Sequence, residues 1–219
     1  ETIHLTKDGR KIPVESNIHK FQYFNREVAL SISRDITERK RVEETQLFLS
    51  QCGRQHPDEN FFESFARYLS DCLEMDFVCI DRLEGDGLTA RTVAVYHDGT
   101  FEDNIAYALK DTPCGDVVGK AVCCFPANVC QLFPSDEVLK NLRAESYVGV
   151  TLWSNTGHPI GLIATIGNKL LADKHLAESV LKTVAIRAAS ELERMQAEES
   201  LRESEAHYRR ITEGLTDYQ

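Results

Sequence analysis

Four cysteine thiols lie close together in the middle of the chain and offer its most obvious chemistry. They are Cys114, Cys123, Cys124 and Cys130, within 17 residues. Four thiolates can bind zinc or an iron–sulfur cluster, and a nearby pair can act as a redox switch. No Cys-x-x-Cys pair occurs among them, and cysteine often serves as a small buried hydrophobe. We therefore keep all four as redox candidates beside a purely structural role, and assign none as a metal ligand.

A second group of candidates belongs to a possible ligand pocket beneath residues 98–135. This segment has an irregular pattern and lies between strand-like runs, a setting where pockets and mobile flaps are common. Its ring-bearing and apolar side chains could line a pocket, and they could equally form core. The pocket candidates are Cys79, Tyr96, Tyr107, Thr112, Cys114, Val117, Phe125, Tyr147 and Trp153.

Catalysis is not predicted, because no nucleophile and base stand in a recognisable motif. His97, His158 and His175 each lie beside turn or cap residues and are interpreted as surface histidines. Asp173 is interpreted as the cap of a helix that follows a turn at residues 167–169. No cofactor can be assigned.

Composition excludes several classes of partner. The net charge of −10 disfavours binding to nucleic acid or to an anionic membrane surface. No apolar run is long enough to span a bilayer, so we expect no membrane contact within this chain. Seven cysteines form an odd number, which favours reduced thiols and a cytoplasmic location. The chain begins at Glu1 without an initiator Met, and we expect it to be a piece of a longer protein.

The elements that must position these residues follow from hydrophobic periodicity. Residues 1–36 alternate as three antiparallel strands, with an Asp-Gly pair at residues 8–9 predicting the first hairpin turn. Helical signals follow from residue 38 and from residue 57, the latter introduced by Pro57. Further strands are predicted over the runs 77–80, 88–96, 147–153 and 160–166, with a short helix between Ser135 and Leu142. The fold class is therefore α+β.

The last helical pattern runs from Asp173 to about Leu215 without a proline. Its first part carries apolar residues suited to packing on the sheet, and its later part is charged. A helix so long and polar is unstable alone in water, and a parallel partner from a second copy would stabilise it. We therefore expect a homodimer formed through the linker helices.

The two ends of the chain resemble parts of PAS domains. The string Thr-Lys-Asp-Gly-Arg at residues 6–10, followed by Ser-Arg-Asp-Ile-Thr-Glu-Arg-Lys at residues 33–40, resembles the C-terminal end of that family. There an Asp-Ile-Thr-Glu element ends the last strand and begins the output helix. Residues 201–211 look like the leader helix of another PAS domain.

The middle of the chain resembles a GAF domain. The supporting strings are Thr-Pro-Cys-Gly-Asp-Val at residues 112–117, Phe-Pro-Ser-Asp at 133–136, Glu-Ser-Tyr-Val-Gly-Val at 145–150 and Gly-His-Pro-Ile-Gly-Leu at 157–162. The resemblance implies a GAF-like antiparallel sheet with flanking helices, preceded by a three-stranded PAS-tail segment. The expected division is a PAS C-terminal part at 1–40, a linker helix at 41–56, the GAF domain at 57–195, and a coiled-coil linker with the start of a PAS domain at 196–219.

The resemblance implies a sensory input module of a bacterial signal-transduction protein. Some GAF domains attach a bilin through a cysteine followed by His, but Gly115 follows Cys114 here. A small ligand would be sensed and its signal relayed through paired linker helices to an output domain, with a histidine kinase favoured. The alternatives are a ligand-free dimerisation or spacer module and a thiol redox sensor, with a diguanylate cyclase as output.

Overall fold

A computed structural model describes residues 1–216 except 8, 10, 25, 53–59 and 86, and for residues 211–216 it describes the backbone alone. The chain divides into two compact units, Glu1–Phe48 and Leu49–Gln219. The predicted turn at Asp8 and helix start at Pro57 lie outside the described residues. In the described part of the chain, no helix has a stretch long and apolar enough to cross a membrane.

The first unit is a three-stranded antiparallel sheet followed by a helix, as the alternating pattern predicted. The strands are β1 (Thr2–Leu5), β2 (Lys11–Tyr23) and β3 (Arg26–Asp35), in the order β1-β2-β3, and the helix is α1 (Thr37–Gln51). Asp35 makes the transition from strand to helix, because its Oδ1 accepts hydrogen bonds from the backbone N–H of Thr37 at 2.8 Å and from its hydroxyl at 2.6 Å. These bonds lower the pKa of the Asp35 carboxyl.

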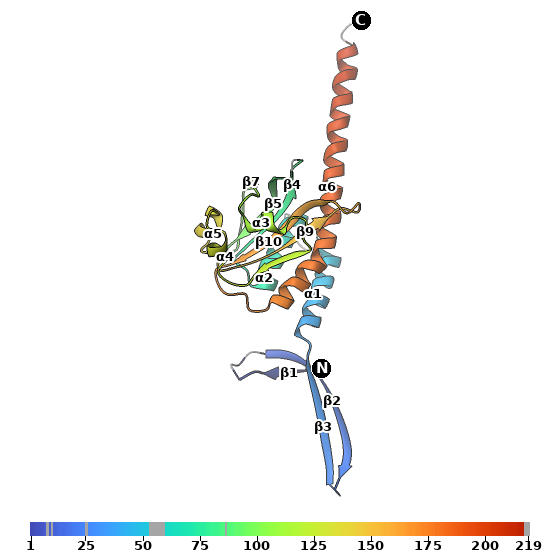
Figure 1. Cartoon of the computed structure of the whole chain (residues 1–219). Helices are drawn as coiled ribbons and strands as arrows, with labels where there is room; N and C mark the ends of the chain where they lie inside the picture. The colour runs from blue at the N-terminus through green and yellow to red at the C-terminus, as the bar shows by residue number, and fades with distance from the viewer. Residues whose placement is uncertain (8, 10, 25, 53–59, 86, 217–219) are drawn as a thin grey trace. The chain divides into compact units, whose positions relative to one another are not determined.

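The second unit is built on a single antiparallel sheet (Figure 1). Its strand order is β6-β5-β4-β10-β9-β8, with β7 also paired to β5. The strands are β4 (Phe77–Leu83), β5 (Thr89–His97), β6 (Thr100–Glu102), β7 (Ala106–Ala108), β8 (Val122–Phe125), β9 (Ser146–Trp153) and β10 (Pro159–Gly167). The helices are α2 (Phe61–Leu73), α3 (Pro113–Val117), α4 (Val129–Leu132), α5 (Glu137–Asn141) and α6 (Lys174–Thr216).

Helices cover both faces of this sheet. α2 and α6 pack on one face, while α3, α4 and α5 lie on the side away from α6 (Figure 1). Successive side chains of a strand point to opposite faces. Along β9, Val148 and Val150 therefore point toward the α6 side, whereas Tyr147 and Gly149 point toward α3. Both faces are buried, so the central strands are apolar along nearly their whole length.

The 43-residue helix α6 changes character along its length. Asp173 caps its start as predicted, because its Oδ1 accepts the backbone N–H of Leu176 at 3.0 Å. The first part buries apolar side chains from Ala177 to Leu192. The side chains from residue 197 to residue 210 are all exposed, including Leu201 and Tyr208.

Candidate functional site

A buried carboxylate lies at the centre of the sheet face that α3 covers. Asp81 of β4 has no exposed surface. Its Oδ2 accepts a hydrogen bond from the Tyr107 hydroxyl at 2.9 Å and one from the Cys79 thiol at 3.3 Å. Cys79 and Asp81 are two residues apart on one strand, so both side chains point to the same face. Tyr107 comes from β7 at the sheet edge.

Two more side chains join this group from other elements. The Tyr147 hydroxyl donates to the Cys114 sulfur at 3.3 Å, and both residues are buried. Cys114 also contacts the thiol of Cys79 and the side chain of Tyr107. We call Cys79, Asp81, Tyr107, Cys114 and Tyr147 the polar cluster. Four elements supply it: β4, β7, α3 and β9.

The cluster leaves one strong acceptor unsatisfied. Among the described residues, Asp81 Oδ1 has no hydrogen-bond partner, and no buried side-chain N or O atom besides it is in that state. Burial raises the pKa of the Asp81 carboxyl from 3.8 to about 7, although the bonds from Tyr107 and Cys79 act in the opposite direction. An unpaired buried acceptor costs about 1–3 kcal/mol, so native proteins rarely retain one without a reason.

The Cys79 thiol of the cluster is held in its protonated, unreactive form. The hydrogen bond with Cys114, burial, and the Asp81 charge all raise the pKa of the Cys79 thiol. Burial likewise raises the pKa of the Tyr147 hydroxyl. Nucleophilic cysteines need a lowered pKa because the thiolate is the reacting form. The cluster therefore fits binding better than covalent chemistry.

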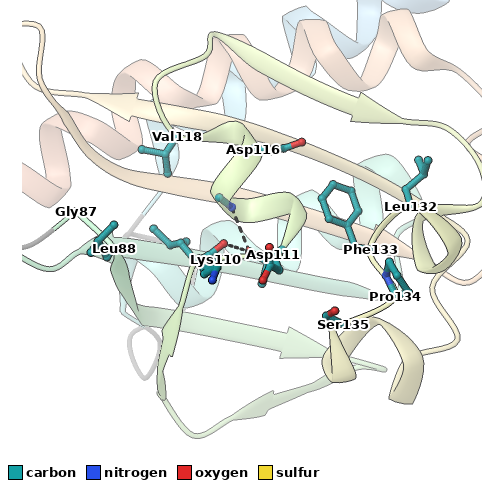
Figure 2. Close-up of a pocket in the computed structure, with 13 residues that line it drawn as sticks. Gly87, Leu88, Lys110, Asp111, Asp116, Val118, Leu132, Phe133, Pro134 and Ser135 are labelled. Carbon is teal, nitrogen blue, oxygen red and sulfur yellow. Dashed lines mark hydrogen bonds between the residues drawn. The ribbon is translucent and has the colours of Figure 1, made fainter.

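A cleft of about 600 Å³ adjoins the polar cluster. Figure 2 shows Asp111, Asp116 and Val118 on or near α3, with Leu132, Phe133 and Pro134 across from them. The full lining is Gly87, Leu88, Leu109, Lys110, Asp111, Thr112, Gly115, Asp116, Val118, Leu132, Phe133, Pro134 and Ser135. Its volume lies within the range typical of small-molecule sites.

A thin wall separates this cleft from the cluster. Leu109 belongs to the buried core around the cluster and also lines the cleft. Gly115 packs so closely on it that a Cβ at residue 115 would clash with the Leu109 carbonyl oxygen. Thr112 joins the two segments, since its hydroxyl donates to the Leu109 carbonyl at 2.7 Å and accepts the Gly115 N–H at 3.1 Å. Movement of residues 109–115 would therefore connect cleft and cluster.

The structure brings together four of the predicted pocket residues, namely Cys79, Tyr107, Cys114 and Tyr147. Val117 packs beside them in the same core. The ring of Phe125 lies beside this group, with its centroid 6.0 Å from that of the Tyr147 ring. Thr112 lies in the wall of the cleft.

Two predicted pocket residues lie elsewhere. Tyr96 is paired with Val78 across β5 and β4, so its side chain points to the face opposite Cys79. Trp153 lines a separate cleft of about 430 Å³ beside α6, together with Ile186. Neither residue contributes to the polar cluster.

The remaining redox candidates are dispersed around α3 and α4. Cys123 and Cys124 lie on β8, where the Cys123 thiol bonds the Asp116 carbonyl at 3.3 Å. Cys130 lies on α4 and bonds the Leu139 carbonyl at 3.2 Å. Burial raises the pKa of all three thiols. Within the described residues, no three His, Cys, Asp or Glu side chains are placed to hold a metal ion.

Sequence reasoning missed Asp81, the central residue of the cluster. The available signal was an acidic residue in phase with Cys79, directly after the apolar run 77–80. An aspartate at such a position reads as the end of a strand. The structure instead continues β4 to Leu83, which places the carboxylate inside the core.

Comparisons with known proteins identify the fold. No family model matches the sequence, and no match is found among curated proteins. Solved structures do match, among them the GAF domain of an Acinetobacter phosphoenolpyruvate-protein phosphotransferase. That match has a TM-score of 0.56 and 12% identity, and covers 74% of this chain and 97% of that one.

Two further structures extend the comparison. Free methionine-R-sulfoxide reductase from Neisseria meningitidis, in complex with its substrate, matches with a TM-score of 0.54 at 14% identity, over 72% of this chain and 89% of that one. The chromophore-binding domain of Stigmatella aurantiaca phytochrome P1 matches with a TM-score of 0.51 at 11% identity, over 86% of this chain and 72% of that one. The fold is therefore GAF-like and of the α+β class, as predicted from sequence.

Proposed function

We propose that this chain is a sensory module that binds a small ligand between its sheet and α3 and relays binding to helix α6. The observation that carries this proposal is the position of two consecutive residues on β4. Asp81 points into the polar cluster, and Arg82 points to the other face, where it donates to Glu199 of α6 at 2.8 Å. One strand therefore contacts both the binding face and the helix.

The same two-sided arrangement recurs on β9. Tyr147 belongs to the polar cluster, whereas the next residue, Val148, is buried on the side where α6 packs. A ligand that moves the side chains of the polar cluster would shift β4 and β9 and so change the packing of α6. Ligand binding can drive such a change only if the ligand prefers one packing over the other.

The output would travel along the exposed part of α6. Leu201 and Tyr208 are exposed and seven residues apart, the spacing of a helical seam. A second copy of the chain would cover this seam, so the functional form is a homodimer. The flanking segments would belong to PAS domains of a longer cytoplasmic signalling protein, with a histidine kinase as the favoured output.

The alternatives are weaker on physical grounds. A ligand-free spacer needs a satisfied core, and the unpaired Asp81 acceptor does not fit that requirement. A thiol switch needs a reactive thiolate, but burial raises the pKa of Cys123, Cys124 and Cys130. The module is accordingly regulatory, without a catalytic role of its own.

Crosslinking at the end of α6 tests the relay. The Tyr208→Cys variant of the full chain is purified natively from its host and treated with a bifunctional maleimide. The experiment is then repeated after unfolding and refolding have removed any bound small molecule. We expect a dimer crosslink whose yield changes when the ligand is lost. The wild-type chain, with its seven native cysteines, measures the background. Equal yields before and after, or no dimer, would contradict the proposal.

A further inference from the structure

The Asp81 carboxylate can accept one more hydrogen bond. Its Oδ2 already accepts from Tyr107 and Cys79, whereas Oδ1 has no partner among the described residues. Among the described residues no ion pair to Asp81 is present, and the neighbouring Arg82 bonds Glu199 and Glu84. The missing group is therefore a hydrogen-bond donor, and a positively charged donor would be favoured most.

The surroundings of Asp81 select among ligand classes. Two tyrosines and two thiols lie around it, and no Lys, Arg or His side chain is buried in the part of the chain that the structure describes. Aromatic rings attract cations through their faces. An anionic group, such as a phosphate or carboxylate, would instead meet the Asp81 charge with no basic residue beside it. The site therefore discriminates against anions.

The cleft outside the wall has the same preference. Two carboxylates, Asp111 and Asp116, line it against one ammonium group, Lys110. The whole chain also carries a net charge of −10. This field concentrates cations at the entrance and repels anions.

We infer that the ligand is a small organic molecule with a protonated nitrogen. Its N–H donates a hydrogen bond to Asp81 Oδ1 after residues 109–115 move aside. This inference rests on the proposed function and names the ligand class of the same site. The nitrogen would lie within hydrogen-bond distance of Oδ1. The organic part of the molecule would lie against Tyr107 and Tyr147 and extend into the cleft.

Three probes of similar size and different charge test the inference. Benzylamine is cationic, benzyl alcohol neutral and benzoate anionic at neutral pH. Each is titrated into the full chain, and binding is followed by chemical-shift changes of backbone amides in β4 and α3. We expect benzylamine to bind at least about tenfold more tightly than benzyl alcohol, the difference of a charge-assisted hydrogen bond, and benzoate to bind least.

Two variants test whether the Asp81 carboxylate causes the preference for benzylamine. Asp81→Asn keeps the size of the side chain and should remove the preference for benzylamine. Asp71→Asn changes an exposed carboxylate on α2, outside the cleft, and should keep the preference. Thermal unfolding shows whether each variant is folded. Equal binding of amine and alcohol, an intact preference in Asp81→Asn, or no binding by any probe would each overturn the inference.

The outcome separates this inference from the proposed function. If a neutral or anionic molecule is found bound to protein from the host, sensing stands and the amine class is wrong. If benzylamine shows the Asp81-dependent preference but does not alter crosslinking at residue 208, the recognition stands and the relay is wrong.

Discussion

The hydroxyl of Tyr107 lies 2.9 Å from Oδ2 of Asp81 and donates a hydrogen bond to a carboxylate with no exposed surface. This bond joins a short edge strand, β7, to the central strand β4. It also favours the charged form of Asp81, and so opposes the effect of burial. The stability of the cluster therefore depends on a residue from the irregular middle of the chain.

Tyr107→Phe should destabilise the second unit by about 1–3 kcal/mol, the cost of removing one partner of a buried polar group. The free energy of unfolding can be measured in denaturant through the fluorescence of Trp153, the single tryptophan, which lies in this unit. Tyr23→Phe, on an exposed tyrosine of the first unit, is the control. Equal stabilities of the two variants would show that the Tyr107 bond contributes nothing.

The pH dependence of stability should carry the signature of Asp81. Its pKa is raised from 3.8 to about 7 in the folded chain. Between these values the unfolded state loses its proton while the folded state keeps it. Stability from this group is therefore complete below about pH 4 and falls as the pH rises to about 7, by at most about 1.4 kcal/mol per pH unit.

Other groups titrate in the same range, so the contribution of Asp81 must be separated from theirs. Comparing wild type with Asp81→Asn does this, because only this titrating group differs between the two proteins. Asn does not titrate, so the difference in unfolding free energy between wild type and variant should shift in favour of the variant from pH 4 to pH 7. Denaturant unfolding at four pH values measures it. Parallel pH profiles for the two proteins would mean that the Asp81 pKa is not raised.

Gly149→Ala should disturb the packing of Tyr147 under α3. A Cβ at residue 149 would lie 2.6 Å from the Tyr147 hydroxyl oxygen and 2.7 Å from a methyl of Val117. Overpacking of this kind costs about 1–3 kcal/mol. Gly85→Ala is the matched control, since nothing lies within 4 Å of its added Cβ. Similar unfolding midpoints for the two variants would contradict the close packing of β9 and α3.

Glu199→Gln should uncouple β4 from α6 with little effect on stability. Both partners of the ion pair with Arg82 are partly exposed, so its loss should cost less than about 1 kcal/mol. In the Tyr208→Cys background, we expect the crosslinking yield to stop responding to loss of the ligand. Glu198→Gln affects only a contact with Arg194 on the same helix and should leave the response intact. A response that survives Glu199→Gln would exclude this pair as the route.

The regular elements of the fold were predictable because their burial imposes a pattern. The apolar runs 77–80, 88–96, 147–153 and 160–166 correspond to β4, β5, β9 and β10. The short strands β6, β7 and β8 were not predicted, since three or four residues are too few to show alternation. They are held by pairing with longer neighbours, which is a property of the tertiary structure.

The site was predictable only in part. Residue type and position suggested Cys79, Tyr107, Cys114 and Tyr147, but not which face of the sheet each would take. Register decides the face, because a shift of one residue moves a side chain to the other side. A register shift between Ile80 and Asp81 in the pairing of β4 with β5 contributes to this arrangement and leaves no local signal in the sequence.

Native mass spectrometry of the full chain purified from its host tests whether a ligand site is built around Asp81. Wild type, Asp81→Asn and Asp71→Asn are compared under identical conditions. We expect a reproducible bound mass on wild type and on Asp71→Asn, and its loss or marked reduction on Asp81→Asn. Protein mass alone in all three samples, or equal bound mass on all three, would contradict a ligand site built around Asp81.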